Sequence, residues 1–206
     1  MKILLLGSTG RVGSHILKLL LNESYEVKVL VRDEQKIQFN HPNLSIIKGN
    51  SLNKLDLEKA LTDIDGVISG LNTDGENTLS RTMELLIPQL EKMNIRRIVT
   101  IGTAGILQSR VEPSILKYLS SESKRKSTTA AADHEKAFNQ LKASMLDWTI
   151  VCPTYLPDGP ISKEFRIEKD FLPIEGKSIS TGDTAFFAFK EFFENKYVQS
   201  RVGISY

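Results

Sequence analysis

The sequence predicts an α/β fold with a doubly wound parallel sheet. Short apolar runs alternate along the chain with amphipathic segments of helical length, a glycine-rich turn follows the first run, and polar or glycine residues follow the later ones. Strands that alternate with helices are joined by right-handed crossovers and become parallel. Ligands of such sheets bind outside the carboxyl ends of the strands, so we expect the functional residues there.

Six apolar runs are expected to form the strands. They cover residues 3–6, 27–31, 44–47, 67–69, 98–101 and 149–152. Residues 76–93 place Leu79, Met83, Leu86 and Leu90 at helical spacing, but Pro88 interrupts this segment. Because an interior proline costs a helix about 3 kcal/mol, we expect a kink there or a later helix start.

Composition narrows the functional classes. The 206 residues allow one sizeable core, and the net charge of +2 comes from interspersed charges, so neither nucleic acid nor a membrane is an expected partner. The first apolar run is too short for a membrane span or a signal-peptide core, which predicts a cytoplasmic protein. One cysteine and three histidines without ligand spacing predict no metal.

The turn at residues 7–13 is typical of a dinucleotide site. Its residues, which we expect to bind a cofactor, are Gly7, Ser8, Thr9, Gly10, Arg11, Val12 and Gly13. In this pattern one glycine permits a sharp turn, one lets the backbone approach a pyrophosphate, and one lets the helix pack closely on the sheet. Backbone N–H groups at the helix start then face the phosphates. The turn therefore predicts a Rossmann-like sheet.

The end of the second strand indicates which nicotinamide cofactor binds. Arg32 and then Asp33 follow this strand, about twenty residues beyond the glycine turn, where the adenosine ribose should lie. An acidic residue there would bind the 2′-hydroxyl of NAD, whereas arginine suits the 2′-phosphate of NADP. Because Arg32 comes first, we favour NADP(H), with assistance from Arg11. Asp33 keeps NAD(H) as the alternative.

The next two strand ends complete the expected cofactor site. The third strand leads into Asn50, Ser51 and Leu52, and the fourth into Ser69, Gly70 and Leu71. Asn50 is suited to reading adenine through paired hydrogen bonds, and Gly70 would let the backbone pass beside the cofactor. Ordinary turns are the alternative explanation for either group.

Two residues are candidates for catalysis. Thr103 follows the fifth strand, where its hydroxyl could bind a substrate carbonyl, contact the nicotinamide or relay a proton. His134, on a predicted helix over residues 129–144, is the histidine best placed to act as an acid. A structural turn hydroxyl and an exposed helix histidine are the alternatives.

Two regions depart from the alternation. Residues 108–129 are polar and include Lys124, Arg125 and Lys126, which indicate either a solvated loop or a lid over an anionic ligand. Residues 158–206 contain a short strand candidate at 177–180, a capping box at Ser180 and Asp183, a phenylalanine-rich helix expected to pack in the core, and a last strand. We expect one domain over residues 1–206, in which 158–206 form a small substrate-side lobe.

Several of these segments together carry a family resemblance. They are the glycine turn, Arg32, Asn50, the Thr103 turn, and residues 133–136, 146–153 and 201–206. The chain resembles the atypical short-chain dehydrogenase/reductases, and among them the NAD(P)H-binding proteins similar to biliverdin IXβ reductase/flavin reductase and to NmrA-like proteins. The resemblance covers essentially the whole chain. It implies that Pro153, Thr154, Tyr155 and Leu156 lie beside the nicotinamide.

A departure from the family pattern shapes the functional hypotheses. No tyrosine is followed four residues later by lysine, so the usual Tyr-x-x-x-Lys proton donor is absent. Flavin and quinone reduction chiefly need a positioned hydride donor, so we favour an NADPH-dependent reductase of such a flat small-molecule acceptor. The alternatives are a non-catalytic NAD(P) redox sensor read by a protein partner and a sugar-nucleotide epimerase or dehydratase. The chain is expected to be a monomer or a homodimer.

Overall fold

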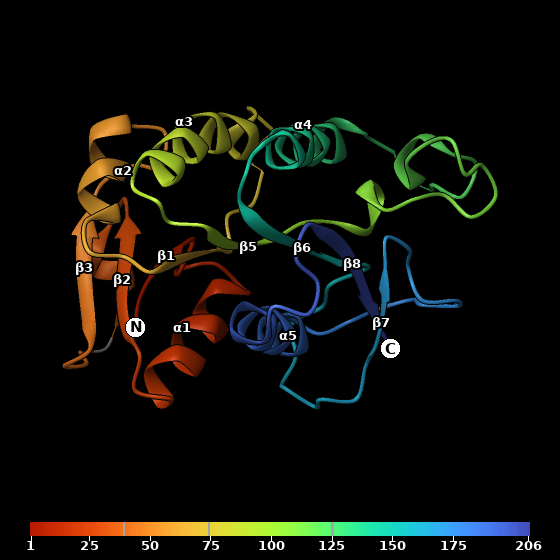
Figure 1. Ribbon diagram of the computed structural model, residues 1–206. Helices are drawn as coiled ribbons and strands as arrows, with labels where there is room; N and C mark the ends of the chain where they lie inside the picture. Colours follow the sequence, from red (N-terminus) through yellow and green to blue (C-terminus); the bar gives the residue numbers. More distant parts are fainter. Residues whose placement is uncertain (39, 74, 125) are drawn as a thin grey trace.

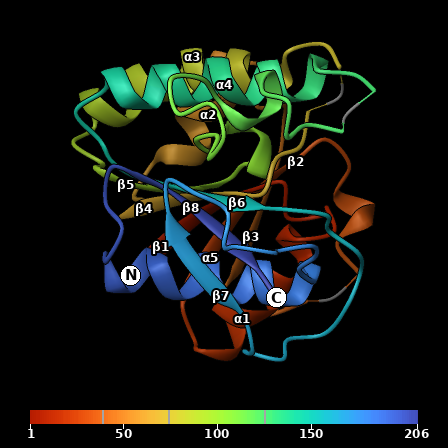
Figure 2. The ribbon, with the colours of Figure 1, turned by 90° about the vertical axis from the view of Figure 1, so that its right-hand side faces the viewer.

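The computed structural model describes residues 1–38, 40–73, 75–124 and 126–206. Within them, eight strands form one sheet in the order β3-β2-β1-β4-β5-β6-β8-β7. The parallel strands are β1 (Lys2–Leu6), β2 (Glu26–Val31), β3 (Leu44–Lys48), β4 (Gly66–Ser69), β5 (Arg97–Ile101), β6 (Asp147–Pro153) and β8 (Ser200–Ser205). Strand β7 (Arg166–Lys169) is antiparallel to β8 at the outer edge (Figure 2). The predicted doubly wound α/β fold is confirmed.

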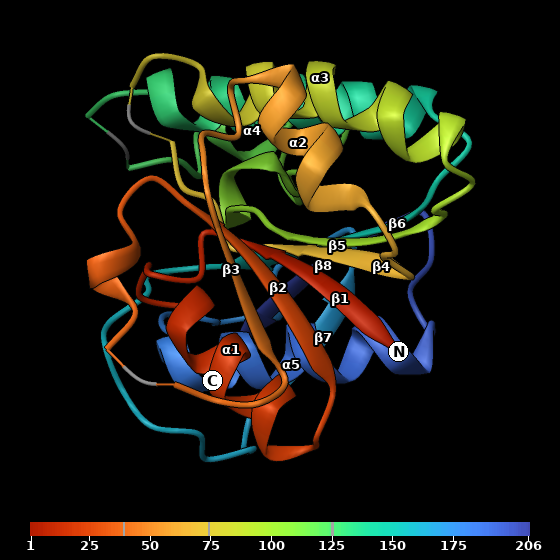
Figure 3. The ribbon, with the colours of Figure 1, turned by 90° about the vertical axis from the view of Figure 1, so that its left-hand side faces the viewer.

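Helices cover both faces of the sheet. Helices α1 (Gly13–Asn22) and α5 (Thr181–Glu194) lie on one face, and α2 (Lys54–Leu61), α3 (Thr78–Lys92) and α4 (Thr129–Ala143) lie on the other (Figure 1). Figure 3 shows the same two layers from the β3 edge. Side chains of β1 alternate between the layers, so Ile3 and Leu5 pack toward α1 while Leu4 and Leu6 pack toward α2 and α3. This two-sided burial makes the central strands continuously apolar.

Helix α3 runs through Pro88, so a later helix start is wrong. Pro88 has no N–H to donate within the helix, but Leu86 and Leu90 on either side of it are fully buried in the core. This packing keeps the helix continuous. The N-terminus of α3 is stabilised from another element, because the Asp133 carboxylate accepts hydrogen bonds from the backbone N–H groups of Leu79 (3.1 Å) and Ser80 (3.0 Å).

The last third of the chain extends the same sheet. Residues 158–206 supply β7, α5 and β8, and the division of the chain at residue 158 stays a prediction. Strand β7 was not expected, whereas residues 177–180 form no strand and contribute a single bridge between Tyr155 and Ser178. Packing of the phenylalanines is confirmed, since Phe187 and Phe192 are buried in the layer of α1 and α5.

Within the described residues, the structure contains no helix long and apolar enough to cross a membrane.

Candidate functional site

Two cavities lie along the carboxyl edge of the parallel strands. One, of about 320 Å³, is lined by residues that follow β1, β2, β3 and β4. The other, of about 680 Å³, is lined in part by residues that follow β5 and β6. Because β4 and β5 are neighbours in the sheet, the two cavities occupy consecutive stretches of one edge. We call them the glycine-turn cavity and the larger cavity.

Glycine is required at two positions of the turn between β1 and α1. Gly7 has a φ of +72°, and a Cβ atom there would lie 2.6 Å from the backbone carbon of Gly70. A Cβ atom on Gly13 would lie 2.1 Å from the carbonyl oxygen of Gly7. The turn is closed by a hydrogen bond from Gly10 N to Gly7 O at 3.0 Å. The backbones of β1, α1 and the β4 loop thus meet without side chains between them, and the glycines form a backbone cradle that a ligand can approach closely.

The start of α1 fits an anionic ligand. The residue before it, Val12, provides no side-chain cap, and no acidic residue occupies the first turn. The N–H groups at a helix start and the positive end of its dipole favour a phosphate. The predicted turn residues fall into two groups. Gly7, Thr9 and Gly10 line the glycine-turn cavity, whereas the side chains of Ser8 and Val12 are buried.

Arg11 does not turn toward the glycine-turn cavity. Its Nε donates a hydrogen bond to Asp158 Oδ1 at 2.6 Å, and its Nη2 donates to the Leu156 carbonyl oxygen at 2.6 Å. Leu156 therefore takes part through its backbone, in a link between the glycine turn and the loop that follows β6.

Arg32 and Asp33 differ in their surroundings. Arg32 is exposed and lines the glycine-turn cavity. Asp33 instead caps a short 3₁₀ turn, Glu34–Lys36, by accepting a hydrogen bond from Gln35 N at 3.1 Å. The cation at this strand end is thus available to a ligand, while the carboxylate has a local structural partner.

The loops after β3 and β4 line the rest of this cavity. Asn50, Ser51 and Leu52 all lie on its wall, but Asn50 Oδ1 accepts from Leu52 N (3.0 Å), and Ser51 Oγ accepts from Thr82 Oγ1 (3.1 Å). Gly70 and Leu71 also line it, whereas Ser69 is buried at the end of β4. Asn72, Thr73 and Thr78 belong to the same wall and were missed. Their position directly after a strand end was the available signal.

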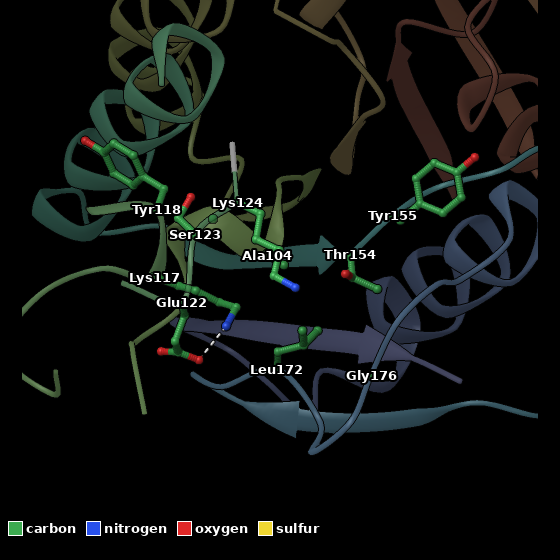
Figure 4. Close-up of a pocket in the computed structure, with 11 residues that line it drawn as sticks. Ala104, Lys117, Tyr118, Glu122, Ser123, Lys124, Thr154, Tyr155, Leu172 and Gly176 are labelled. Atoms are coloured by element: carbon green, nitrogen blue, oxygen red, sulfur yellow. Dashed lines mark hydrogen bonds and ion pairs between the residues drawn. The ribbon is translucent and has the colours of Figure 1, made fainter. Parts of the chain in front are cut away.

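The larger cavity has an aromatic end and a charged end (Figure 4). Tyr155 and Thr154 lie at one end, and the ion pair between Lys117 and Glu122 lies at the other, with Lys124 extending into the space between them. Ala104, Gly105, Tyr118, Ser123, Leu172 and Gly176 complete the lining. Most of these residues come from segments outside the regular strands and helices, and sequence reasoning identified only Thr154 and Tyr155 as site residues.

The charged end is held in a fixed network. Glu122 accepts hydrogen bonds from Lys117 Nζ at 2.5 Å, Ser109 Oγ at 2.6 Å and Arg110 N at 2.8 Å. Burial alone would raise the pKa of Glu122, but these hydrogen bonds outweigh it and lower the pKa to about 2. The described part of residues 108–129 is therefore tied together by a carboxylate that is ionised at neutral pH. Arg125 lies outside the described residues.

Tyr118 lines the larger cavity but directs its hydroxyl to Glu135, to which it donates a hydrogen bond. Burial, together with this hydrogen bond, raises the pKa of Tyr118 to about 12. The phenol is thus bound to an acceptor, Glu135, that does not line the larger cavity.

Thr103 and Pro153 lie at the strand ends beside the larger cavity without lining it. Thr103 precedes the 3₁₀ turn Ala104–Ile106, and its hydroxyl oxygen accepts from Gly105 N at 3.4 Å. Pro153 ends β6 and is buried, directly before the two lining residues Thr154 and Tyr155. Both residues therefore lie next to the wall of the larger cavity.

His134 lies in the core, away from both cavities. It is 9% exposed and borders an apolar space of about 10 Å³ together with Leu79, Met83 and Phe138. A solvent-exposed helix histidine is therefore the wrong alternative, and a role for His134 as an acid stays a prediction. Cys152 is fully buried, and burial raises the pKa of its thiol to about 12. Among the described residues, no group of three or more His, Cys, Asp or Glu side chains is placed to hold a metal.

Solved structures of bacterial proteins share this fold. A candidate epimerase from Bacteroides thetaiotaomicron is 26% identical, with a TM-score of 0.86 over 100% of this chain and 96% of that one. A candidate NADH-flavin reductase from Streptococcus pneumoniae is 23% identical, with a TM-score of 0.83 over 100% and 99% of the two chains. A Rossmann-fold NAD(P)-binding family protein from Shigella flexneri is 21% identical, with a TM-score of 0.76 over 99% and 92%.

A sequence model of one protein family, described as NAD(P)H-binding, matches residues 7–195. The match begins at the first glycine of the turn and extends through α5, so it includes every strand end that lines the two cavities. Together with the glycine cradle and the uncapped start of α1, it supports the resemblance drawn from the sequence. The chain belongs to the NAD(P)H-binding family.

Proposed function

We propose that this protein is an NADPH-dependent reductase that delivers a hydride to a flat small-molecule acceptor such as a free flavin or quinone. The observation that carries this proposal is the succession of two cavities along one sheet edge, a glycine cradle at β1 and β4 followed by a 680 Å³ space at β5 and β6. A bound reduced nicotinamide supplies the hydride in this chemistry. The protein supplies the positions of donor and acceptor.

The glycine-turn cavity would hold the adenosine half and the phosphates. Gly7, Gly10 and Gly70 keep side chains out of the path of the cofactor, and the N–H groups at the start of α1 face its diphosphate. The nicotinamide half would then extend along the sheet edge toward Ala104 and Thr154, which line the neighbouring larger cavity. Hydride transfer requires donor and acceptor to be in contact, and this arrangement supports such a contact.

Arg32 supports NADPH over NADH. Its guanidinium is exposed at the cavity wall where the adenosine ribose is expected, while Asp33 is engaged as a cap. An arginine hydrogen bond to a phosphate is charge-assisted and worth about 1.5 to 3 kcal/mol. Arg32→Ala should therefore weaken NADPH binding by about 10- to 100-fold and leave NADH binding nearly unchanged. Lys36→Ala removes an exposed cation outside the cavity and serves as the control. Equal loss for both cofactors would contradict the assignment.

The groups lining the larger cavity support an acceptor that needs no strong acid from the protein. Tyr118 is held by Glu135 with a raised pKa, and Glu122 is ionised by its partners. A flavin or quinone holds the incoming electrons in its own ring system and can take its proton from water. A ketone would require a positioned acid to protonate the developing alkoxide.

Anaerobic mixing of the purified protein with NADPH and a panel of flavins, quinones and tetrapyrroles tests the proposal through the loss of nicotinamide absorbance. Oxidation of NADPH with at least one acceptor, at a rate proportional to the enzyme concentration, is the expected result. Tight NADPH binding without oxidation by any acceptor would contradict the reductase and favour the redox sensor.

A further inference from the structure

The loop after β6 is fastened to the glycine turn by Arg11. The two hydrogen bonds of this side chain, to the Asp158 carboxylate and the Leu156 carbonyl oxygen, join positions that lie 147 and 145 residues apart in the sequence. In the sheet, β4 and β5 lie between β1 and β6. Residues 154–158 of this loop therefore run along the carboxyl edge from the larger cavity to the glycine turn, and we call them the strap.

The middle of the strap is held by a second segment. Tyr155 O accepts from Ile179 N at 3.0 Å, and Pro157 O accepts from Thr181 N at 3.1 Å. Asp158 and the lining residue Tyr155 are thus tied to the same short segment that leads into α5, and this segment links a shift at Asp158 to the wall of the larger cavity.

The ion pair between Arg11 and Asp158 can be replaced by another ion pair at little cost in stability. The side chains of Arg11 and Asp158 are 55% and 77% exposed, and an exposed ion pair contributes little net stability. Arg11 belongs to the turn whose N–H groups are expected to face the cofactor diphosphate, and a diphosphate brings at least two negative charges to that place. Asp158 and the diphosphate thus present alternative anions to the same guanidinium.

We propose that Asp158 competes with the cofactor diphosphate for Arg11. In the free protein, Asp158 holds Arg11 and fastens the strap to the glycine turn. When the cofactor binds, Arg11 turns to the phosphates, and the strap, released from the glycine turn but still held by residues 179–181, shifts the wall of the larger cavity that carries Tyr155. Arg11 and Asp158 are positioning residues in this scheme, which rests on the nicotinamide cofactor of the proposed function but not on the identity of its acceptor.

Equilibrium binding of NADPH, followed by quenching of protein fluorescence, tests the competition. Asp158→Asn removes the competing charge and should bind NADPH about 2- to 5-fold more tightly, as expected for an exposed ion pair. Arg11→Gln should bind it about 10-fold more weakly because a charge-assisted hydrogen bond is lost. The double variant should match Arg11→Gln, since Asp158 acts only through Arg11. Arg11→Lys should recover part of the affinity by restoring the charge.

The controls separate this competition from a general charge effect. Glu164→Gln removes another exposed carboxylate from the same loop region and should leave the NADPH affinity unchanged. Unchanged or weaker binding by Asp158→Asn, or additive effects in the double variant, would overturn the proposal. NADPH binding is measured without turnover, so a failed acceptor panel would refute the reductase without affecting this test.

Hydrogen exchange of peptides covering residues 154–163 provides a second measurement. Saturating NADPH should accelerate exchange in the wild-type protein, whereas Arg11→Gln should exchange rapidly with or without the cofactor. Slower exchange of this segment in the wild-type complex would mean that the cofactor tightens the strap, and the competition would then be refuted.

Discussion

Replacing Asp183 with asparagine is expected to destabilise the protein by about 2 to 4 kcal/mol at neutral pH. Asp183 is fully buried at the start of α5, where its carboxylate accepts hydrogen bonds from Ser162 N (2.8 Å), Lys163 N (2.8 Å), Ser162 Oγ (2.7 Å) and Tyr206 Oη (2.9 Å). It thereby joins α5, the loop after the strap and the residue following β8. Each hydrogen bond to a charged group is worth roughly 1 to 1.5 kcal/mol more than one to a neutral group, and an amide can keep only some of them.

The pH dependence distinguishes the charge from the shape of this side chain. Burial alone would raise the pKa of Asp183, but hydrogen bonds from Lys163 N, Ser162 Oγ and Tyr206 Oη outweigh it and lower the pKa. A carboxyl with a lowered folded pKa stabilises above its unfolded value, which is about 3.9, and loses this contribution as the pH falls through the folded pKa. The difference between wild type and Asp183→Asn should therefore be full at pH 7 and shrink below about pH 4.

Urea denaturation at pH 7 and near pH 3, with thermal unfolding as a second measurement, checks this prediction. The expected loss corresponds to a decrease in Tm of about 4 to 16 °C for a chain of this length. Glu164→Gln removes an exposed carboxylate from the same region and should leave Tm within about 2 °C of wild type. An Asp183→Asn variant as stable as wild type at pH 7, or one whose deficit stays constant at pH 3, would refute the reasoning.

Three further changes test the glycine cradle and the larger cavity. Gly7→Ala should lower the free energy of unfolding by about 2 to 5 kcal/mol, since it adds the strain of a left-handed backbone to a close backbone contact. Gly75 also has a positive φ, +87°, but open space around it. An equal loss of stability for Gly75→Ala in urea denaturation would therefore refute the contribution of the close contact. Tyr118→Phe should keep NADPH oxidation within about threefold of wild type with an unchanged pH profile, because a general acid would contribute 100-fold or more; a larger loss would identify the hydroxyl as that acid. Glu122→Gln should accelerate proteolysis of residues 108–124 at pH 7. The wild-type segment should reach the same rate only as the pH falls below about 4 toward the folded pKa of about 2; equal rates at pH 7 would contradict a structural role for this carboxylate.

The strands β1 to β6 and the glycine turn were predicted because their signals are local. Each strand is an apolar run between polar segments, and the glycines at 7, 10 and 13 answer the steric demands of a single turn. Strand β7 was not predicted because its residues, Arg166–Lys169, carry charges of alternating sign and form a strand only by pairing with β8. The later helix start expected from Pro88 was wrong for the opposite reason, since burial of the helix face outweighed the local cost of the proline; the alternative, a kink, stays a prediction.

The lining of the glycine-turn cavity was largely predictable from the sequence, whereas the lining of the larger cavity was not. Thr154 and Tyr155 were expected, but Lys117, Glu122 and Leu172 come from irregular segments with no periodicity to interpret. A charge run in the sequence does not reveal whether a lysine faces solvent, a carboxylate or a cavity. The structure assigns Lys117 to Glu122 and directs Lys124 into the cavity.

The sequence by itself determined the fold class, the order of the central elements and the cofactor class, because alternating apolar runs and a glycine turn act over short stretches of chain. Only the tertiary structure decided the surroundings of Arg11, Asp133 and His134. It joined Arg11 to Asp158 and Asp133 to the start of α3, and it buried His134 beside an apolar space that Leu79 and Met83 also line. Side chains find such partners when the sheet brings distant loops together, and local sequence does not specify that proximity.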